Sequence, residues 1–510
     1  MSSLKFGTSG LRGLVTDLVG EPSRQWAAAF LSYLDEAGLA GQRVVMVGRD
    51  LRSSSPRIAE QCVEAAAALG WQAIDCGALP TPALALVAMT EGASAIMVTG
   101  SHIPDDRNGL KFYTPAGEIS KADEAGILAA LDGEAGSGEA RVTPTRPFGT
   151  PSPQGGGGFS SVAAKSPSPL RGRGPEGTGG GATANNAPLS VYISRYLDFF
   201  PADTLTGMTV GVYQQSSVAR DILAQILQDL GARVISFERA DRFIPVDTEA
   251  HRPEDLALLR SWAAGHAIDA IVSTDGDADR PLVADAAGEV VRGDLLGLLT
   301  ASHLSLDTIV TPITSSAAID TSGVARYVVR TKVGSPFVIA GMEQALTAGS
   351  KAVVGFEANG GVLLGSNVES DGRTLSALPT RDAVLPIVCA LAAASKAGRT
   401  LRQTVDALGA GYALADRLKE VGSERSGPLL SRFATDRAFA DVFFNEQGKI
   451  AGVDDLDGVR FSLDDGSTVH FRASGNAPEF RCYVEAPTNA RARALLAWGL
   501  AKAADEMGGC

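Results

Sequence analysis

The residues best suited to chemistry lie in one short stretch, TGSHIPDDRNGLK, at positions 99–111. The apolar run 93–98 before it predicts a short buried strand, so Ser101 is expected on a turn at the carboxyl end of that strand. Open α/β sheets place their chemistry at this edge. A serine hydroxyl becomes a useful nucleophile when a neighbour activates it, and His102 and Lys111 are both close in sequence. An ordinary surface loop is the alternative interpretation of so short a motif.

A second stretch, DGDADR, predicts a cation site. Asp275, Asp277 and Asp279 stand at alternate positions, so an extended loop directs all three carboxylates at one hard cation. Mg²⁺ suits this set because it commonly binds few carboxylates together with a substrate phosphate. A calcium EF-hand loop is excluded, since its sixth and twelfth positions hold Arg280 and Ala286 in place of Gly and Glu. The alternative interpretation of DGDADR is a solvent-exposed acidic turn that binds no cation.

The stretch GFEANGG at 355–361 follows another apolar run and offers Glu357 and Asn359 at a spacing of two. In an extended loop both side chains point to the same side, where an acceptor and a donor-acceptor group suit vicinal sugar hydroxyls.

A fourth stretch, RASGNAPEFR, gathers charged and neutral hydrogen-bond donors between two predicted strands near the end of the chain. These residues are Arg472, Ser474, Gly475, Asn476 and Arg481. Glycine lets backbone amides approach an anion closely, and arginine binds one with two parallel hydrogen bonds. The pattern predicts an anion-binding loop, although a salt bridge on a strand face is an equally good interpretation of Arg481.

The opening KFGTSGLRG at 5–13 is too rich in glycine to be helical and predicts a flexible turn that carries Arg12. Strands and helices then alternate through most of the chain, which predicts α/β domains with parallel strands. The segment 134–190 is rich in Gly, Pro and Ser and cannot bury enough apolar surface to offset its ordering entropy, so we expect a disordered insert. The expected units are 1–133, 134–190, 191–292, 293–397 and 398–510.

Composition limits the classes of partner. A formal net charge of -13 argues against nucleic-acid and anionic-membrane binding, and no apolar segment is long enough to span a bilayer. The cysteines show no metal-like spacing, and the chain has no secretory apolar region, so the cytoplasm is the expected compartment.

The four motifs occur in the order in which they are found in the α-D-phosphohexomutases, and the chain resembles this family over all but the 134–190 insert. Members of that family interconvert hexose 1- and 6-phosphates. The resemblance implies three similar mixed-sheet α/β domains and a C-terminal α+β domain around a central cleft. It also implies a metal-dependent enzyme that works through a phosphoserine.

The resemblance assigns roles to individual residues. Ser101 is expected to carry the phosphoryl group and to complete, with the three aspartates of DGDADR, the Mg²⁺ site. Lys111 stands at the general acid/base position, with His102 as an alternative base or hydrogen-bonding partner. Arg12 and Arg280 are expected to neutralise charge during phosphoryl transfer.

The expected substrate is a hexose phosphate, with GFEANGG on the sugar and RASGNAPEFR on the non-reacting phosphate. Within the family, the residues of GFEANGG and its neighbours favour a phosphomannomutase that uses a hexose 1,6-bisphosphate intermediate. Phosphoglucomutase and phosphoglucosamine mutase are the alternatives. A non-catalytic sugar-phosphate-binding protein is the alternative of another class, kept open by Ile103, Pro336 and the insert. A monomer or homodimer is expected.

Overall fold

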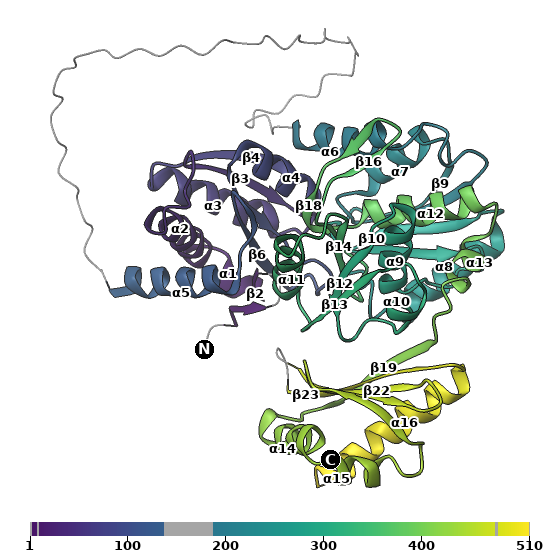
Figure 1. Ribbon diagram of the computed structural model, residues 1–510. Helices are drawn as coiled ribbons and strands as arrows, with labels where there is room; N and C mark the ends of the chain where they lie inside the picture. The colour runs from purple at the N-terminus through teal and green to yellow at the C-terminus, as the bar shows by residue number, and fades with distance from the viewer. Residues whose placement is uncertain (1–2, 8–9, 137–186, 475–477, 509–510) are drawn as a thin grey trace, which may run out of the picture.

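Four domains make up the structure, a computed structural model that describes residues 3–7, 10–136, 187–474 and 478–508 (Figure 1). Domains 1, 2 and 3 are packed against one another, and domain 4 lies below them in Figure 1. Most of the predicted insert, and Gly475 and Asn476 of the predicted phosphate-binding loop, fall outside the described residues.

Domain 1 is built on a seven-stranded mixed sheet in the order β1-β2-β6-β5-β3-β4, with β7 paired to β6. Its elements are β1 (Lys5–Gly7), β2 (Gly10–Leu14), α1 (Val15–Leu18), α2 (Glu21–Glu36), β3 (Val44–Arg49), α3 (Ser55–Ala68), β4 (Gln72–Ala78), α4 (Thr81–Glu91), β5 (Ser94–Val98), β6 (Arg107–Thr114), β7 (Gly117–Glu118) and α5 (Lys121–Gly136). β3 is parallel to β4 and β5, whereas β6 is antiparallel to β5 and β2. β6 is a strand that the sequence analysis did not predict, and it runs antiparallel to β5 because the loop 99–106 is too short for a helical crossover.

The prediction of a turn around Arg12 is wrong. Arg12 lies on β2, opposite Lys5 of β1 and Gly109 of β6. The glycines serve close approach of strands here, since a Cβ added to Gly109 would lie 2.2 Å from the main-chain oxygen of Leu11. Strand pairing therefore overrides the weak strand propensity of this segment, and it fixes Arg12 rigidly at the edge of the site.

Domain 2 carries a four-stranded sheet in the order β11-β10-β8-β9, in which only β11 is antiparallel to its neighbour. Its elements are α6 (Ala187–Phe199), β8 (Thr209–Gln215), α7 (Arg220–Asp229), β9 (Arg233–Arg239), α8 (Pro253–Gly265), β10 (Ala270–Thr274) and β11 (Pro281–Asp285). The DGDADR loop connects β10 to β11, as the sequence predicts.

Domain 3 repeats this plan with the five-stranded order β13-β12-β14-β15-β18. Its elements are α9 (Gly293–His303), β12 (Thr308–Pro312), α10 (Ala318–Thr321), β13 (Tyr327–Thr331), α11 (Ser335–Thr347), β14 (Val353–Phe356), β15 (Val362–Leu364), β16 (Val368–Ser370), β17 (Arg373–Leu375), β18 (Leu378–Asp382), α12 (Val384–Ala397) and α13 (Leu401–Asp406). α13 buries Leu401 and Val405 in the same core as α12, so we describe it with domain 3.

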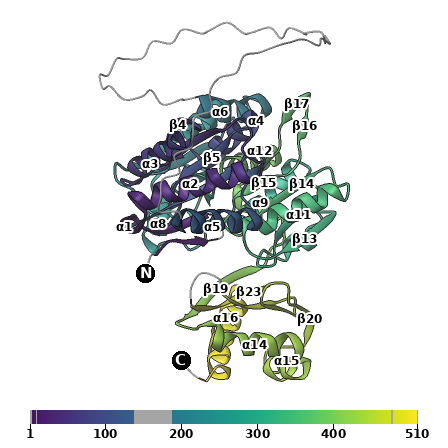
Figure 2. The same cartoon turned by 90° about the vertical axis from the view of Figure 1, so that its left-hand side faces the viewer.

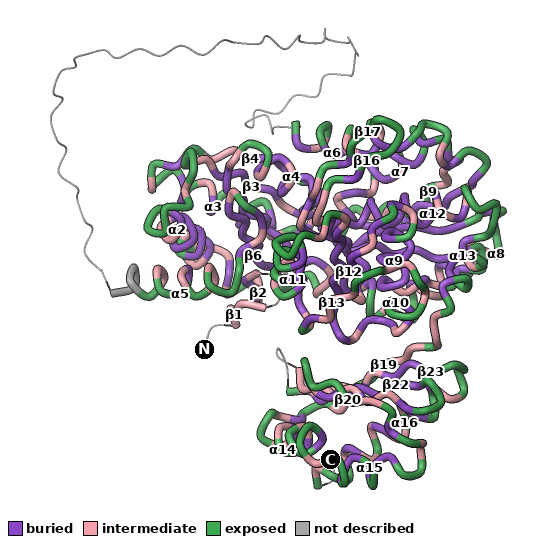
Figure 3. Tube along the Cα trace, viewed as in Figure 1, coloured by how far each residue is buried: buried purple, intermediate pink, exposed green. Residues whose placement is uncertain are grey.

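One cluster of buried apolar side chains runs through the first three domains. It includes Met46 of β3, Leu223 of α7 and Val388 of α12, all at most 1% exposed. Figure 3 shows the buried segments concentrated where these domains meet. Because dense interiors do not deform continuously, domains 1, 2 and 3 form one rigid support for the site.

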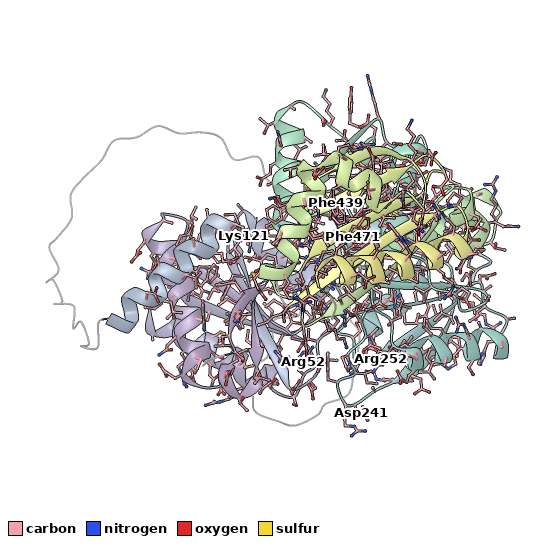
Figure 4. The ribbon with its side chains drawn as sticks, turned by 90° about the horizontal axis from the view of Figure 1, so that it is seen from below. Arg52, Lys121, Asp241, Arg252, Phe439 and Phe471 are labelled. Atoms are coloured by element: carbon pink, nitrogen blue, oxygen red, sulfur yellow. The ribbon has the colours of Figure 1, made fainter. Side chains whose placement is uncertain are left out.

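Domain 4 has a separate core. Its five antiparallel strands follow the order β19-β23-β22-β21-β20, with the helices on one face, and Figure 2 shows it set apart below the other domains. The elements are β19 (Tyr412–Lys419), α14 (Ser423–Thr435), α15 (Arg437–Phe443), β20 (Ile450–Asp454), β21 (Val459–Leu463), β22 (Thr468–Ala473), β23 (Glu479–Ala486) and α16 (Asn489–Glu506). Phe433 is packed between the rings of Phe439 and Phe471, which Figure 4 labels. The predicted fold class is confirmed.

Two features bear on the expectations from composition. Within the described ranges, no helix combines the length and the apolar character needed to cross a bilayer. The cysteines in these ranges, Cys62, Cys76, Cys389 and Cys482, are buried and unpaired.

Candidate active site

Ser101 lies on the turn after β5, as the sequence predicts. Its backbone is left-handed at φ 54°, and its amide donates to Thr99 Oγ1 at 2.8 Å. The side chain is fully buried, and Oγ donates a short hydrogen bond to Asp275 Oδ2 of domain 2. The hydroxyl therefore faces the aspartate loop and is shielded from bulk water.

Arg52 holds this turn from behind and was not among the predicted site residues. Its guanidinium donates at 2.6 to 3.1 Å to the main-chain oxygens of Ser101, Ile103, Pro104 and Arg107. Asp50 accepts from Arg52 Nε and from Thr99 Oγ1, which ties both ends of the turn to β3. The ring of Phe243, from domain 2, lies 3.9 Å from the guanidinium, and Figure 4 labels Arg52 where domains 1 and 2 meet. A buried network so well satisfied keeps the turn in one conformation.

The aspartate loop brings its three carboxylates together. Asp275, Asp277 and Asp279 each offer an oxygen within 4.8 Å of the others, and all three side chains are buried. Ala278 turns the loop at φ 59°, and the amides of Asp279 and Arg280 donate to Asp275 Oδ1 at 3.2 Å. The alternate spacing and the tight turn together produce one cluster.

Cations from two other domains neutralise this cluster. Lys111, on β6, donates to Asp277 Oδ2 at 2.6 Å and also to Asp279. Burial and the charges of the other two aspartates raise the pKa of Asp275 well above its ordinary value. Burial also acts to raise the pKa of Asp279, but the cations Arg381, Lys111 and Arg280 hold it well below its usual range.

The residues present fit a divalent cation. Asp277 Oδ1 and Asp279 Oδ1 are buried without a hydrogen-bond partner among the described residues. A buried carboxylate oxygen without a partner is costly unless a ligand completes it. Together with Ser101, the three aspartates form an all-oxygen set of the kind that Mg²⁺ prefers.

His102 and two arginines line the other side of Ser101. His102 Nδ1 accepts from Arg280 Nη1 at 3.2 Å and lies 3.2 Å from Ser101 Oγ. Burial, followed by the charges of Arg280 and Arg12, lowers the pKa of His102 to about 2, so the ring is neutral. Burial and Arg280 lower the pKa of Arg12 to about 10, which leaves it charged at neutral pH. The pair Arg12 and Arg280 therefore provides fixed positive charge beside the hydroxyl.

The GFEANGG loop follows β14 as predicted. Asn359 Nδ2 donates to Glu357 Oε2 at 3.3 Å, so both side chains lie on the same side of the loop. Asn359 Oδ1 accepts from the amide of Gly361 at 3.0 Å, and the turn passes through Gly360 at φ 85°. These hydrogen bonds fix the side chains of Glu357 and Asn359, and both residues line a cleft between the domains.

The RASGNAPEFR segment joins β22 to β23 of domain 4, between two strands as predicted. Arg472 Nε donates to Asp457 Oδ2 at 2.9 Å, and the amide of Ser474 donates to the main-chain oxygen of Glu479. Arg481 Nη2 donates to Glu479 Oε2 at 3.1 Å, which is the salt bridge on the strand face that the sequence left open. Gly475 and Asn476 stay predictions.

Residues from all four domains line one cleft. They include Arg12 and His102 of domain 1, Arg280 of domain 2, Glu357 and Asn359 of domain 3, and Arg472, Ser474 and Arg481 of domain 4. The structure therefore brings these predicted residues around one space. Ser101 and the three aspartates are not among the lining residues: they are buried next to it, where Ser101 contacts His102 and Asp279 pairs with Arg280.

Family models described as phosphoglucomutase/phosphomannomutase, alpha/beta/alpha domains I, II and III match residues 3–136, 191–288 and 292–412. A phosphomannomutase of Sinorhizobium fredii is 46% identical over 499 residues, which cover 98% of each chain. The chain belongs to the phosphoglucomutase/phosphomannomutase family.

Other members of the family agree with this assignment. A phosphomannomutase of Salmonella muenchen is 37% identical over 486 residues, which cover 95% of this chain and 92% of the relative. The solved structure of a phosphoglucomutase/phosphomannomutase family protein from Burkholderia thailandensis superimposes with a TM-score of 0.73 at 18% identity and covers 99% of this chain and 98% of that one. That likeness concerns the fold shared by this phosphohexomutase family.

Several residues that support the site in this member of the family lie outside the sequence motifs. Three such residues each contact a motif. Arg52 donates to the serine turn, Thr81 Oγ1 donates to Asp277, and Arg381 donates to Asp279. Each comes from a part of the chain distant from the residue that it contacts, so spacing gives no signal.

Proposed function

We propose that this protein is a phosphomannomutase, which interconverts mannose 6-phosphate and mannose 1-phosphate through a phosphoserine at Ser101 and a hexose 1,6-bisphosphate. The observation that carries the proposal is the buried contact of Ser101 Oγ with Asp275, inside a carboxylate cluster that Lys111 also enters. The nearly full-length similarity to phosphomannomutases supports the choice of sugar.

Phosphoryl transfer requires positioning and charge neutralisation more than covalent chemistry. Ser101, Asp275, Asp277 and Asp279 would hold Mg²⁺, which supplies charge neutralisation to the transferring phosphoryl group. Arg280 and Arg12 add fixed positive charge on the opposite side of Ser101.

A proton must leave the attacking sugar hydroxyl. Lys111 is our proposed acceptor. It would act as the neutral amine, because the ammonium that donates to Asp277 and Asp279 has no lone pair, and it would return the proton in the reverse step. His102 is neutral and accepts from Arg280, so its setting supports the role of hydrogen-bonding partner rather than base.

The rest of the cleft orients the sugar. Glu357 and Asn359 would grip sugar hydroxyls, while Arg472, Ser474 and Arg481, together with Gly475 and Asn476, would hold the phosphate that does not react. The bisphosphate must present each phosphate to Ser101 in turn without leaving, and domain 4 supplies the wall that keeps it in the cleft. A cytoplasmic monomer or homodimer remains part of the proposal.

A coupled assay tests the proposal directly. The protein receives Mg²⁺, a trace of hexose 1,6-bisphosphate and, separately, mannose 1-phosphate, glucose 1-phosphate or glucosamine 1-phosphate. We expect turnover that chelation abolishes, with the largest kcat/KM for mannose 1-phosphate. A larger value for glucose or glucosamine phosphate would reassign the sugar. Absence of turnover with all three would support a binding protein and reject the mutase.

A further inference from the structure

Arg381 lies between the cation site and the sugar loop. It is the penultimate residue of β18, and its side chain is 1% exposed. The following residue, Asp382, accepts hydrogen bonds from the hydroxyls of Tyr192 and Tyr196 of α6, which fix the end of the strand. A Cβ added to Gly361 would lie 2.8 Å from Arg381 Cδ, so the sugar loop leaves just enough room for this arginine. The guanidinium is therefore placed rigidly.

Arg381 donates hydrogen bonds to one oxygen of Asp279 and to one oxygen of Glu357, and it leaves the other oxygen of each carboxylate without a bond to the arginine. Nε and Nη2 donate to Asp279 Oδ2 at 3.1 and 2.8 Å, whereas Asp279 Oδ1 has no hydrogen-bond partner among the described residues and lies 3.7 Å from Arg280 Nε. Nη1 donates to Glu357 Oε2 at 3.4 Å, the same oxygen that accepts from Asn359. One oxygen of Asp279 stays directed at the cation site, and Glu357 Oε1 is left for a ligand.

We propose that Arg381 is a positioning residue with two opposed effects: it orients Glu357 for the sugar and, by its charge, weakens the affinity of the aspartate cluster for Mg²⁺. This inference rests on the proposed function for the identity of both ligands. It adds a connection between the cation site and the sugar loop that neither motif contains.

The two effects have opposite signs on removal of the arginine. A fixed cation bonded to a ligand carboxylate repels a second cation at short range, and the burial of both groups limits screening. Its loss strengthens Mg²⁺ binding, while Lys111 and Arg280 continue to balance part of the carboxylate charge. Its loss also frees Glu357 from a charge-assisted hydrogen bond and weakens sugar binding. A merely structural role would weaken both.

The test uses the dephosphorylated full-length protein, which has no phosphoryl group to transfer, so calorimetry reports binding without turnover. Mg²⁺ and mannose 1-phosphate are titrated separately into wild type, Arg381→Met and Arg381→Lys. For Arg381→Met we expect the Kd for Mg²⁺ to fall about tenfold and the Kd for mannose 1-phosphate to rise about tenfold. Arg381→Lys keeps the charge without the planar fork, so Mg²⁺ binding stays within about threefold of wild type while sugar binding weakens.

Arg402→Met is the matched control, since it breaks another arginine pair, with Asp285, away from the cleft. Weakening of both ligands, or a change in neither, would overturn the inference. If Arg381→Met does not fold, as judged by circular dichroism, the Lys variant decides: weaker sugar binding with unchanged Mg²⁺ binding supports the inference, and any other pattern rejects it. A wild-type protein that binds neither ligand would instead reject the proposed function.

Discussion

The cluster around Ser101 and the proposed phosphate-binding loop of domain 4 are built in different ways. Ser101, Asp277 and Lys111 are at most 5% exposed, and they stand on domains that share one apolar core. Arg472 and Arg481 are partly exposed and belong to a domain with a core of its own. The described bonds that cross to domain 4 include the amide of Val333 to Asp457 and those of Glu485 with domain 3.

This difference separates two tasks. The reacting groups must be held within fractions of an ångström, which a dense interior achieves. In the proposed function, the loop of domain 4 binds the non-reacting phosphate and must admit substrate and release product, and a domain with its own core can move as a unit. Damage to the first region should therefore lower kcat, whereas damage to the second should raise KM.

The largest effect is expected from Asp277→Asn. The change removes one carboxylate from the cation site and a partner from Lys111. We expect kcat to fall at least about 1,000-fold and calorimetric Mg²⁺ binding to be lost. Asp241→Asn, on an exposed residue of the same domain (Figure 4), is the control and should leave both unchanged. Normal Mg²⁺ binding by Asp277→Asn would place the metal elsewhere.

Arg52→Lys tests whether the serine turn must be rigid. Lysine keeps the charge beside Asp50 but cannot reach four main-chain oxygens, so the hydroxyl of Ser101 is held less firmly. We expect kcat to fall about 100-fold with KM within about threefold of wild type. A rise in KM with normal kcat would show that Arg52 serves substrate binding instead.

Arg472→Ala should act mainly on binding, because it removes a guanidinium from the phosphate grip. Steady-state kinetics should show a rise in KM of about 30-fold and a smaller fall in kcat. Arg437→Ala, which breaks an exposed pair with Asp441 in the same domain, is the control. An unchanged KM would remove Arg472 from the grip.

The smallest expected effect is a dependence of the stability of domain 4 on pH. Burial lowers the pKa of His470 to about 4, below the value of 6.5 expected in the unfolded chain. Because the unfolded state then binds the proton more readily, stability is lost as the pH falls from 6.5 toward 4. Between pH 7 and pH 5 this amounts to about 2 kcal/mol of unfolding free energy. Urea titrations at both pH values should show this loss in wild type and a smaller one in His470→Gln.

The fold and the centre of the site could be predicted from the sequence because their signals are local. Ser101 follows an apolar strand, and the alternate aspartates of DGDADR need only one turn to converge. Arg12 was assigned to a turn because glycine propensity says nothing of the strand β6 that pairs with it. Arg52 and Arg381 have no motif, since their role depends on contacts between segments far apart in the chain. Such contacts follow from tertiary packing and cannot be inferred from the spacing of residues along the sequence.

The central claim is that Ser101 carries the transferred phosphoryl group. Dephosphorylated protein is incubated with hexose 1,6-bisphosphate and Mg²⁺, and its peptides are mapped by mass spectrometry. The account predicts one phosphoryl group on Ser101 that disappears on addition of excess mannose 1-phosphate, and neither phosphorylation nor turnover in Ser101→Ala. Phosphorylation at another residue, or normal turnover of Ser101→Ala, would contradict it.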